Sequence, residues 1–332
     1  MIKLKIITKQ FKKNIDYERY FSNKDVCFVD IETTGLSRNY NPIYLIGVLY
    51  YLRNKGVWTI TQYFSNNIEE EKDVLNEFVK FVSSFDQIIT YNGESFDIPF
   101  INYRLIHNRI SYEVPRDKSL DIYKIIKNNR YYLSLDNLKL KTIEKYLGIY
   151  REDIYTGKEC IDFYIDYTNT NNNDSLEKIL QHNYDDLFYM LDILQVIDII
   201  DDKRSFILEY EDSNVLLFIE ELSIIGDQLI VKGNVENDKK INLIHYDSNY
   251  KIEFSKNNKF SITLDFNVGL VTPTEKGLFI EKNKIGLSNN IVDSTIYNLS
   301  PNILLLKVEK EYCVDNIKMI LNDLLTKSLA SF

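Results

Sequence analysis

Two carboxylates within an apolar, strand-like segment constrain this chain more than any other feature. The segment from Cys27 to Leu36 reads Cys-Phe-Val-Asp-Ile-Glu-Thr-Thr-Gly-Leu. Because side chains alternate along a strand, Asp30 and Glu32 point to the same face. A bare Asp-x-Glu pattern is more often a solvated strand end, but two carboxylates on a buried strand repel each other unless a cation lies between them. The segment therefore predicts a cation site whose oxygen ligands suit Mg²⁺ or Mn²⁺.

Strand-like segments dominate the first ninety residues, and helical patterns follow up to about residue 200. Runs of β-branched and aromatic residues predict strands at Val26–Ile31, Tyr44–Leu52, Val57–Phe64 and Gln87–Tyr91. Apolar residues at helical spacing predict helices at Glu69–Ser83, Ile98–His107, Asp121–Asn129, Leu135–Leu147, Glu159–Tyr167 and Ser175–Ile199. Ser175 is the candidate N-cap of the last helix. Antiparallel strands followed by helices that pack on the sheet are typical of an α/β layer structure.

The sequence changes in character after the charged stretch Asp198–Arg204, which we interpret as a junction between domains. Short alternating segments, separated by Asn, Asp, Gly and Lys turns, predict a β-rich domain closed by a helix at Asp315–Ser328. Its predicted strands are Asp227–Asn234, Lys240–Tyr246, Tyr250–Phe254, Phe260–Phe266 and Gly277–Lys282. We therefore expect an N-terminal extension at 1–24, an α/β domain at 25–200 and a β-rich domain at 205–332.

Two further segments place acidic residues on predicted helices. In Asn92-Gly-Glu-Ser-Phe-Asp97 a turn follows a strand and Asp97 opens a helix. A carboxylate there gains from the helix dipole, so a simple N-cap is the structural alternative, and Asn92 could bond across the turn or to a substrate. On the last helix, His182 and Asp186 are four residues apart and share a face, whereas Asp185 is turned away by about 100°. Helix geometry therefore selects the pair of His182 and Asp186.

In order, the three segments resemble the exonuclease motifs of the DEDD (DnaQ-like) superfamily, and more closely those of the YprB-like ribonuclease H-like group. The matching motifs are Asp30-Ile-Glu-Thr-Thr-Gly, Asn92-Gly-Glu-Ser-Phe-Asp97 and His182-Asn-Tyr-Asp-Asp186. The match extends over Ser119-Leu-Asp-Ile-Tyr123 and over residues 135–149, which are similar to a helix of polymerase proofreading domains. The resemblance covers residues from about 25 to 195 and implies a ribonuclease H-like mixed sheet flanked by helices.

The resemblance also implies a site that holds two divalent cations, Mg²⁺ or Mn²⁺. Asp30 would bridge both ions, Glu32 and Asp186 would complete the tighter site, and Asp97 would support the looser one. His182 would orient or deprotonate the attacking water. The chain departs from the family in one respect, because a histidine stands at the spacing of the tyrosine branch. The subclass and the identity of the general base therefore stay open.

A substrate track is predicted between residues 103 and 145, where basic residues and tyrosines interleave. Residues 101–150 hold ten Lys or Arg against five Asp or Glu, although the whole chain carries a net charge of −9. Lys and Arg neutralise phosphates and Tyr rings stack on unpaired bases, while the alternative for most single residues is the solvated face of a helix. The residues expected to touch a substrate are Thr33, Thr34, Asn92, Phe96, Lys139 and Lys141.

Composition excludes several classes of protein. The net charge of −9 opposes a protein that coats nucleic acid nonspecifically. The apolar runs are too short to span a membrane, and the N-terminus is too polar for a signal peptide. Cys27, Cys160 and Cys313 lie far apart and form neither a disulfide framework nor a metal-binding pair. A cytoplasmic location is the expectation.

The leading hypothesis is a metal-dependent 3′–5′ exonuclease that hydrolyses phosphodiester bonds of single-stranded DNA or RNA. One alternative is a nucleic-acid-binding ribonuclease H-like module with little turnover. The four carboxylates weigh against it, because repulsive acids at a phosphate site do not help binding. Another alternative is a part of a repair or RNA-processing assembly, recruited by a protein partner through the β-rich domain.

Overall fold

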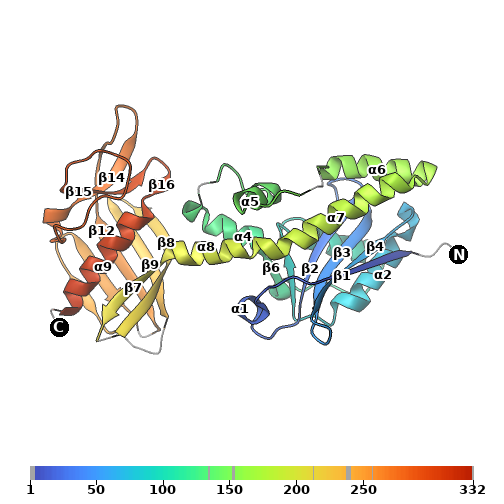
Figure 1. Ribbon diagram of the computed structural model, residues 1–332, viewed down its shortest axis with the longest axis horizontal. Helices are drawn as coiled ribbons and strands as arrows, with labels where there is room; N and C mark the ends of the chain where they lie inside the picture. Colours follow the sequence, from blue (N-terminus) through green and yellow to red (C-terminus); the bar gives the residue numbers. More distant parts are fainter. Residues whose placement is uncertain are drawn as a thin grey trace. The chain divides into compact units, whose positions relative to one another are not determined.

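The computed structural model describes residues 4–133, 135–151, 154–211, 213–236, 241–255 and 257–330. The chain divides into two compact units, each described by itself (Figure 1). The first comprises residues 1–130 and 135–197, and the second comprises residues 131–134 and 198–332. The division at 197/198 falls inside the helix α8 (Gln195–Arg204), so the charged stretch that we interpreted as a junction is helical.

The first unit is built on a six-stranded sheet of order β1-β4-β3-β2-β5-β6. Its strands are β1 (Lys5–Phe11), β2 (Val26–Thr33), β3 (Ile43–Leu52), β4 (Val57–Phe64), β5 (Gln87–Thr90) and β6 (Ser119–Asp121). The pairs among β1, β4, β3 and β2 are antiparallel, whereas β5 and β6 continue the sheet parallel to β2. The strand that carries both motif carboxylates therefore lies inside the sheet. The predicted fold class, a ribonuclease H-like mixed sheet flanked by helices, is confirmed.

Helices pack on both faces of this sheet (Figure 1). Val29 and Ile31 of β2 share a core with apolar residues of α2 (Glu71–Val82) and α3 (Asp97–His107). A second cluster joins Tyr44 to residues of α6 (Gly157–Thr170) and α7 (Asn173–Ile193). Because strand side chains alternate, Asp30 and Glu32 point away from Val29 and Ile31 and face the side of α7 rather than that of α2. The remaining helices of this unit are α1 (Tyr17–Phe21), α4 (Ile122–Asn128) and α5 (Leu140–Tyr146), with short 3₁₀ helices at Ile68–Glu70 and Arg116–Lys118.

Residues 5–11 belong to the sheet of the first unit rather than to an extension of it. β1 pairs along its whole length with β4, from Lys5 opposite Phe64 to Phe11 opposite Trp58. Its exposed and half-buried residues alternate at the start, as in an edge strand with one solvated face. The prediction that residues 1–24 form a separate extension is therefore wrong for residues 5–11. Such a pairing depends on a partner more than forty residues away, which local pattern does not reveal.

Two predicted helices have different ends in the structure. The N-cap of α7 is Asn172, whose side chain accepts a hydrogen bond from Asp174 N, whereas the Ser175 hydroxyl donates to Asp166 Oδ2 at 2.5 Å. The predicted helix to Ile199 is divided, because α7 ends at Ile193 and α8 follows. α5 begins at Leu140 rather than Leu135, since the Asn137 side chain accepts from Lys139 N and from the Thr142 hydroxyl.

The second unit is β-rich with a closing helix, as predicted. Its first sheet is antiparallel, of order β10-β11-β12-β9-β8-β7, and its second sheet has the order β13-β14-β15-β16. The strands are β7 (Ser205–Tyr210), β8 (Ser213–Ile225), β9 (Gln228–Glu236), β10 (Ile244–Tyr246), β11 (Tyr250–Phe254), β12 (Lys259–Asp265), β13 (Asn267–Leu270), β14 (Lys276–Glu281), β15 (Ile303–Val308) and β16 (Glu311–Tyr312). The 3₁₀ helices of this unit are Arg130–Tyr132, which ends in it, and Lys282–Lys284. Lys240, the first residue of one predicted strand, lies outside the described residues.

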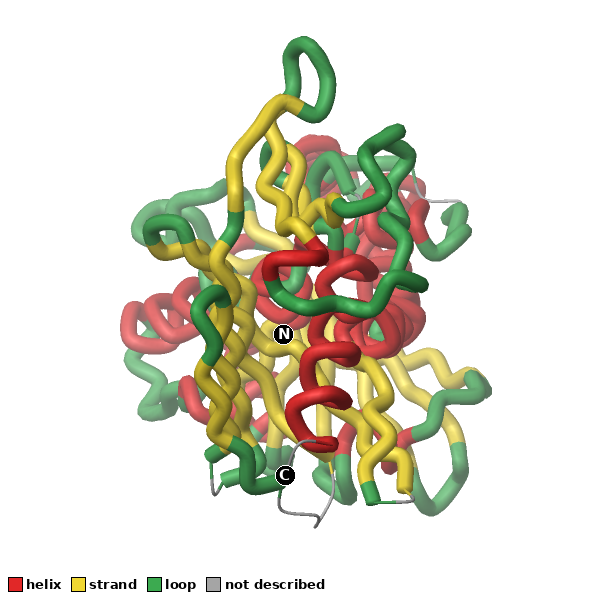
Figure 2. Tube along the Cα trace, turned by 90° about the vertical axis from the view of Figure 1, so that its left-hand side faces the viewer, coloured by secondary structure: helices red, strands yellow, loops and turns green. Residues whose placement is uncertain are grey.

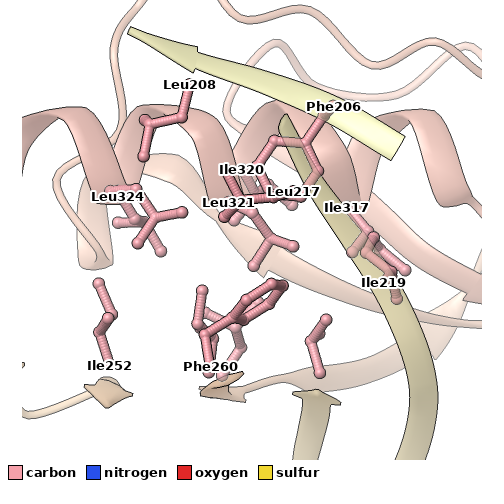
Figure 3. Close-up of a cluster of buried hydrophobic side chains, with 14 of the residues drawn as sticks. Phe206, Leu208, Leu217, Ile219, Ile252, Phe260, Ile317, Ile320, Leu321 and Leu324 are labelled. Atoms are coloured by element: carbon pink, nitrogen blue, oxygen red, sulfur yellow. The ribbon is translucent and has the colours of Figure 1, made fainter. Parts of the chain in front are cut away.

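The helix α9 (Val314–Ala330) lies against the strands of the second unit (Figure 2). Its buried residues Ile317, Ile320 and Leu324 lie in one cluster with Phe206 of β7 and Phe260 of β12 (Figure 3). This spacing of three and four residues is that of one helix face, so a single apolar stripe closes the β-rich core. Within the described part of the chain, no helix is long and apolar enough to cross a membrane.

Candidate metal centre

The site begins at the end of β2, where Asp30 and Glu32 lie opposite Gly47 and Leu45 of β3. The register shifts directly after Glu32, so the strand changes direction once it has presented both carboxylates. Glu32 is 7% exposed. The backbone therefore holds two acids on one largely buried face, as the alternation along the strand predicts.

The helix α7 approaches this face because residue 47 is a glycine. A Cβ atom at Gly47 would lie 2.2 Å from Asn183 Oδ1 and 2.5 Å from Leu187 Cδ1. Without that atom, Asn183 reaches the strand, and its Nδ2 donates to Asp30 Oδ2 at 2.8 Å. Asn183 Oδ1 in turn accepts from Gln62 Nε2 at 2.8 Å. Through these two hydrogen bonds, Asn183 holds the Asp30 carboxylate in place and joins α7 to the sheet.

Two further site residues come from the same helix. His182 Nε2 lies 3.8 Å from Glu32 Oε1 and 3.8 Å from Asp186 Oδ2. One ligand atom from each of Glu32, His182 and Asp186 falls within 4.8 Å of the others, a spacing that could hold a metal ion. Asp185 is buried and accepts from Gln181 Nε2 at 2.7 Å. The structure thus brings together the pair that helix geometry selects.

Asp97 completes the acidic group from a third element. It is the first residue of α3 and is 6% exposed, and its Oδ1 accepts from Ile31 N at 3.2 Å. The N-cap position belongs to Phe96, so the alternative of Asp97 as a simple N-cap is wrong. The preceding turn is held by Asp121, whose carboxylate accepts from the backbone N–H of Asn92 and of Glu94. Asp97 is thereby bonded to β2, and the turn that precedes it is bonded to β6.

Burial and neighbouring negative charge raise the pKa of two of these acids, Asp30 and Asp97. Burial raises the pKa of Asp30 well above its ordinary range, and the charges of Asp186, Glu32 and Asp97 raise it further. Burial raises the pKa of Asp97 to about 7, with Asp121 and Asp186 adding to the effect and backbone N–H donors opposing it. Crowded, buried carboxylates of this kind are stabilised in the charged form by a cation.

The donor set fits a hard divalent cation. Carboxylate oxygens with one imidazole nitrogen suit Mg²⁺ or Mn²⁺ better than a thiolate-binding metal, and Cys27 and Cys160 are buried. The Tyr44 hydroxyl is buried with no hydrogen-bond partner among the described residues. Burial raises the pKa of Tyr44, and the charges of Glu32 and Asp30 add to the effect.

Arg151 is a site residue that the sequence did not indicate. Its guanidinium forms ion pairs with Asp186 and with Glu144 of α5, and its side chain is only 4% exposed. Arg151 follows a short helix in an irregular segment, thirty-five residues before Asp186. No periodicity marks such a residue, so only the tertiary contact reveals it.

The predicted substrate contacts near β2 and α3 differ in their exposure and in their bonding partners. Thr33 is 8% exposed and its hydroxyl donates to Gly35 O at 2.8 Å, so only its acceptor capacity remains for a nucleotide. Thr34 is half-buried and its backbone N–H donates to Pro42 O. Asn92 is exposed, with a left-handed φ of 65° that shapes the turn. Phe96 is half-buried against Phe100, with ring centroids 5.3 Å apart.

Several basic residues of the predicted track have structural partners. Lys141 Nζ donates to Tyr155 O at 2.6 Å, Lys118 Nζ donates to Phe85 O, and Lys124 pairs with Glu94. Lys139 is exposed at the start of α5. Tyr132 is buried and belongs to the second unit. Several members of the predicted track thus serve local contacts, and the track as a whole stays a prediction.

The solved structures compared with this chain include proteins of distant sequence similarity. The family B DNA polymerase of Pyrobaculum calidifontis matches with a TM-score of 0.41 and 16% identity, over 53% of this chain and 24% of that one. The exonuclease I of Methylocaldum szegediense has a TM-score of 0.33 and 10% identity, over 63% of this chain and 54% of that one. The zinc-bound E. coli exonuclease I in complex with single-stranded DNA has a TM-score of 0.32 and 11% identity, over 63% of this chain and 54% of that one. The chain thus spans about half the length of these exonucleases and a quarter of the polymerase.

No curated protein matches the chain. The family model of the RNase H superfamily, in contrast, matches residues 27–197, which include β2, the turn before α3 and the whole of α7. The match takes in every acidic residue of the site. Because it covers more than half of the 332 residues, the chain belongs to the RNase H superfamily.

Proposed function

We propose that the protein is a metal-dependent 3′–5′ exonuclease of the DEDD type, which hydrolyses phosphodiester bonds of single-stranded DNA or RNA. Membership in the RNase H superfamily supports a nuclease. The observation that carries the proposal is the convergence of Glu32, His182 and Asp186 within 4.8 Å, beside two carboxylates whose pKa values are raised. A surface that only bound phosphate would gain nothing from this concentration of negative charge.

Each protein group has a definable task in this reaction. Asp30, Glu32, Asp97 and Asp186 would hold two divalent cations, which when bound activate water and neutralise charge on the phosphate. His182 Nε2 lies beside two of these acids and would orient the attacking water or accept its proton. Burial keeps bulk water from competing for the carboxylate oxygens, which strengthens each of these contacts.

The proposal of a single-stranded substrate rests on exposed polar groups of the first unit. Lys139 is exposed, and the Tyr91 hydroxyl donates to Leu138 O at 2.7 Å, which joins its segment to the turn at Asn92. Asn92 itself is exposed on that turn, directly before the loop that leads to Asp97. These residues could contact a backbone phosphate and a base edge of one strand.

The test uses the full-length protein and oligonucleotides that carry a 5′ label. With Mg²⁺ or Mn²⁺, we expect a ladder of products shortened from the 3′ end, no cleavage when the 3′ end is blocked, and loss of cleavage in Asp186→Asn. Asp185→Asn is the matched control, because Asp185 is the neighbouring buried acid that bonds to Gln181. Matched single- and double-stranded DNA and RNA would define the substrate.

Three results would contradict the proposal. If wild-type protein and Asp186→Asn both leave every substrate intact, the chain is not a nuclease under these conditions. Metal-dependent binding of the oligonucleotide without cleavage would favour a binding module with little turnover. Internal cuts in 3′-blocked substrates would support nuclease activity but exclude cutting from the 3′ end. A protein partner of the β-rich unit would be tested separately, by comparing the activity of residues 1–204 with that of the full chain.

A further inference from the structure

Asp186 makes different contacts through its two carboxylate oxygens. Oδ2 lies 3.8 Å from His182 Nε2, on the side of the candidate metal centre. Oδ1 instead accepts a hydrogen bond from Arg151 Nη1. The carboxylate is therefore turned so that one oxygen faces the metal ligands while the other is engaged by a fixed cation.

Arg151 can fix Asp186 because it is itself fixed. Its Nε donates to Glu144 Oε2 at 2.7 Å and its Nη2 donates to Glu144 Oε1, which is the bidentate pairing that suits a planar guanidinium. Glu144 is 1% exposed and Arg151 is packed 5.7 Å from the centroid of the Tyr189 ring. Only the Nη1 edge is directed at Asp186, so rotation of the guanidinium would break the bonds to Glu144.

We infer that Glu144 and Arg151 form a buried relay that positions Asp186 as a metal ligand. The relay rests on the proposed function, since it concerns a ligand of the proposed metal centre. Its two members carry opposite charges, so together they leave the net charge of the site almost unchanged. Their contribution is geometric: Arg151 holds Oδ1 and leaves Oδ2 on the side of Glu32 and His182, where the ion would bind. Arg151 is thus a positioning residue, not a catalytic one.

The relay has a close internal control in the same unit. Arg104 and Glu71 form a second buried pair, with Arg104 Nε 2.7 Å from Glu71 Oε1 and Nη2 2.6 Å from Oε2. Their side chains are 7% and 4% exposed, similar to those of Arg151 and Glu144. Glu71 additionally accepts from Ile43 N, and neither member of this pair contacts a candidate metal ligand among the bonds described. The two pairs therefore share burial and geometry but differ in their relation to Asp186.

The experiment measures Mn²⁺ affinity by calorimetric titration of the full-length protein, with no nucleic acid present. We expect Arg151→Lys to weaken Mn²⁺ binding by about 10- to 100-fold, as is usual when a partner of a metal ligand is lost, and Arg104→Lys to leave it within about twofold. Lysine keeps the charge but cannot make the bidentate pair. The fluorescence of Trp58, the single tryptophan, verifies that the first unit is folded.

If Arg151→Lys does not fold, the paired substitution Glu144→Leu with Arg151→Met removes both buried charges while keeping side-chain volume. It is expected to weaken Mn²⁺ binding to a similar extent. Unchanged or tighter Mn²⁺ binding in a folded variant would overturn the inference, as would an equal loss in Arg104→Lys. Unchanged Mn²⁺ affinity with a raised KM for oligonucleotide would make Arg151 a phosphate ligand instead. Because the titration needs no cleavage, a wild type that is inactive but whose Mn²⁺ affinity depends on Arg151 would contradict only the proposed exonuclease activity.

Discussion

Protonation of Asp97 should couple the stability of the first unit to pH when no metal is present. Burial raises the pKa of Asp97 from 3.8 to about 7, so the folded state holds a proton that the unfolded chain releases. A raised folded pKa contributes stability that is fully present below the unfolded value and is lost as pH rises through the folded value. The metal-free first unit should therefore become less stable between pH 5 and pH 8. The pKa of Asp30 is also raised and acts in the same direction.

The size of the effect follows from the two pKa values. Linkage with an unfolded pKa of 3.8 and a folded pKa of about 7 gives a loss of about 2.5 kcal/mol for Asp97 between pH 5 and pH 8. A divalent cation replaces the proton, so saturating Mg²⁺ or Mn²⁺ should restore most of this stability at pH 8 and little of it at pH 5. Asp97→Asn mimics the protonated form and keeps an acceptor for the Ile31 N–H.

The assay is urea unfolding in chelator, followed by the fluorescence of Trp58, which is 1% exposed in β4 and reports on the first unit. We expect Asp97→Asn to be the more stable protein at pH 8 and to show a pH dependence smaller by about 2.5 kcal/mol. The same slope of stability against pH in both proteins would refute the assignment of the proton to Asp97. If the metal-free wild type gains stability steadily up to pH 8, the buried acids do not destabilise the first unit when they lose their protons, and the reasoning is wrong.

Three further substitutions test packing, two of them at the site and one in the β-rich unit. Gly47→Ala would place a Cβ atom 2.2 Å from Asn183 Oδ1, so α7 must shift; we expect weakened Mn²⁺ binding with the circular dichroism spectrum retained. Asn183→Ala leaves Gln62 and Asp30 without their shared partner, and urea unfolding should show a loss of about 1–3 kcal/mol. Leu324→Ala, at a side chain 1% exposed in α9, should cost about 2–5 kcal/mol in the β-rich unit while leaving the Trp58 transition in place; a shift of that transition would show that the two units unfold together.

The sequence by itself determined which site residues share one face of a strand or of a helix. Asp30 and Glu32 share a face because strand side chains alternate, and His182 and Asp186 share one because they are four apart on a helix. The same rule separated Asp186 from its neighbour Asp185. Apolar patterns also placed most strands and helices of the first unit, since burial of one face imposes a period that survives in the sequence.

Tertiary structure alone decided which distant residues meet. Pairing of β1 with β4, the bond from Asn183 to Asp30 and the ion pair of Arg151 with Asp186 join positions from 35 to 153 residues apart. Such contacts arise from the way sheet and helices pack, and no local period records them. Gly47 shows why: its neighbours in the strand are ordinary, and its importance comes from a helix that begins more than a hundred residues later. The sequence therefore supplied the ligands, whereas packing supplied the residues that hold them in place.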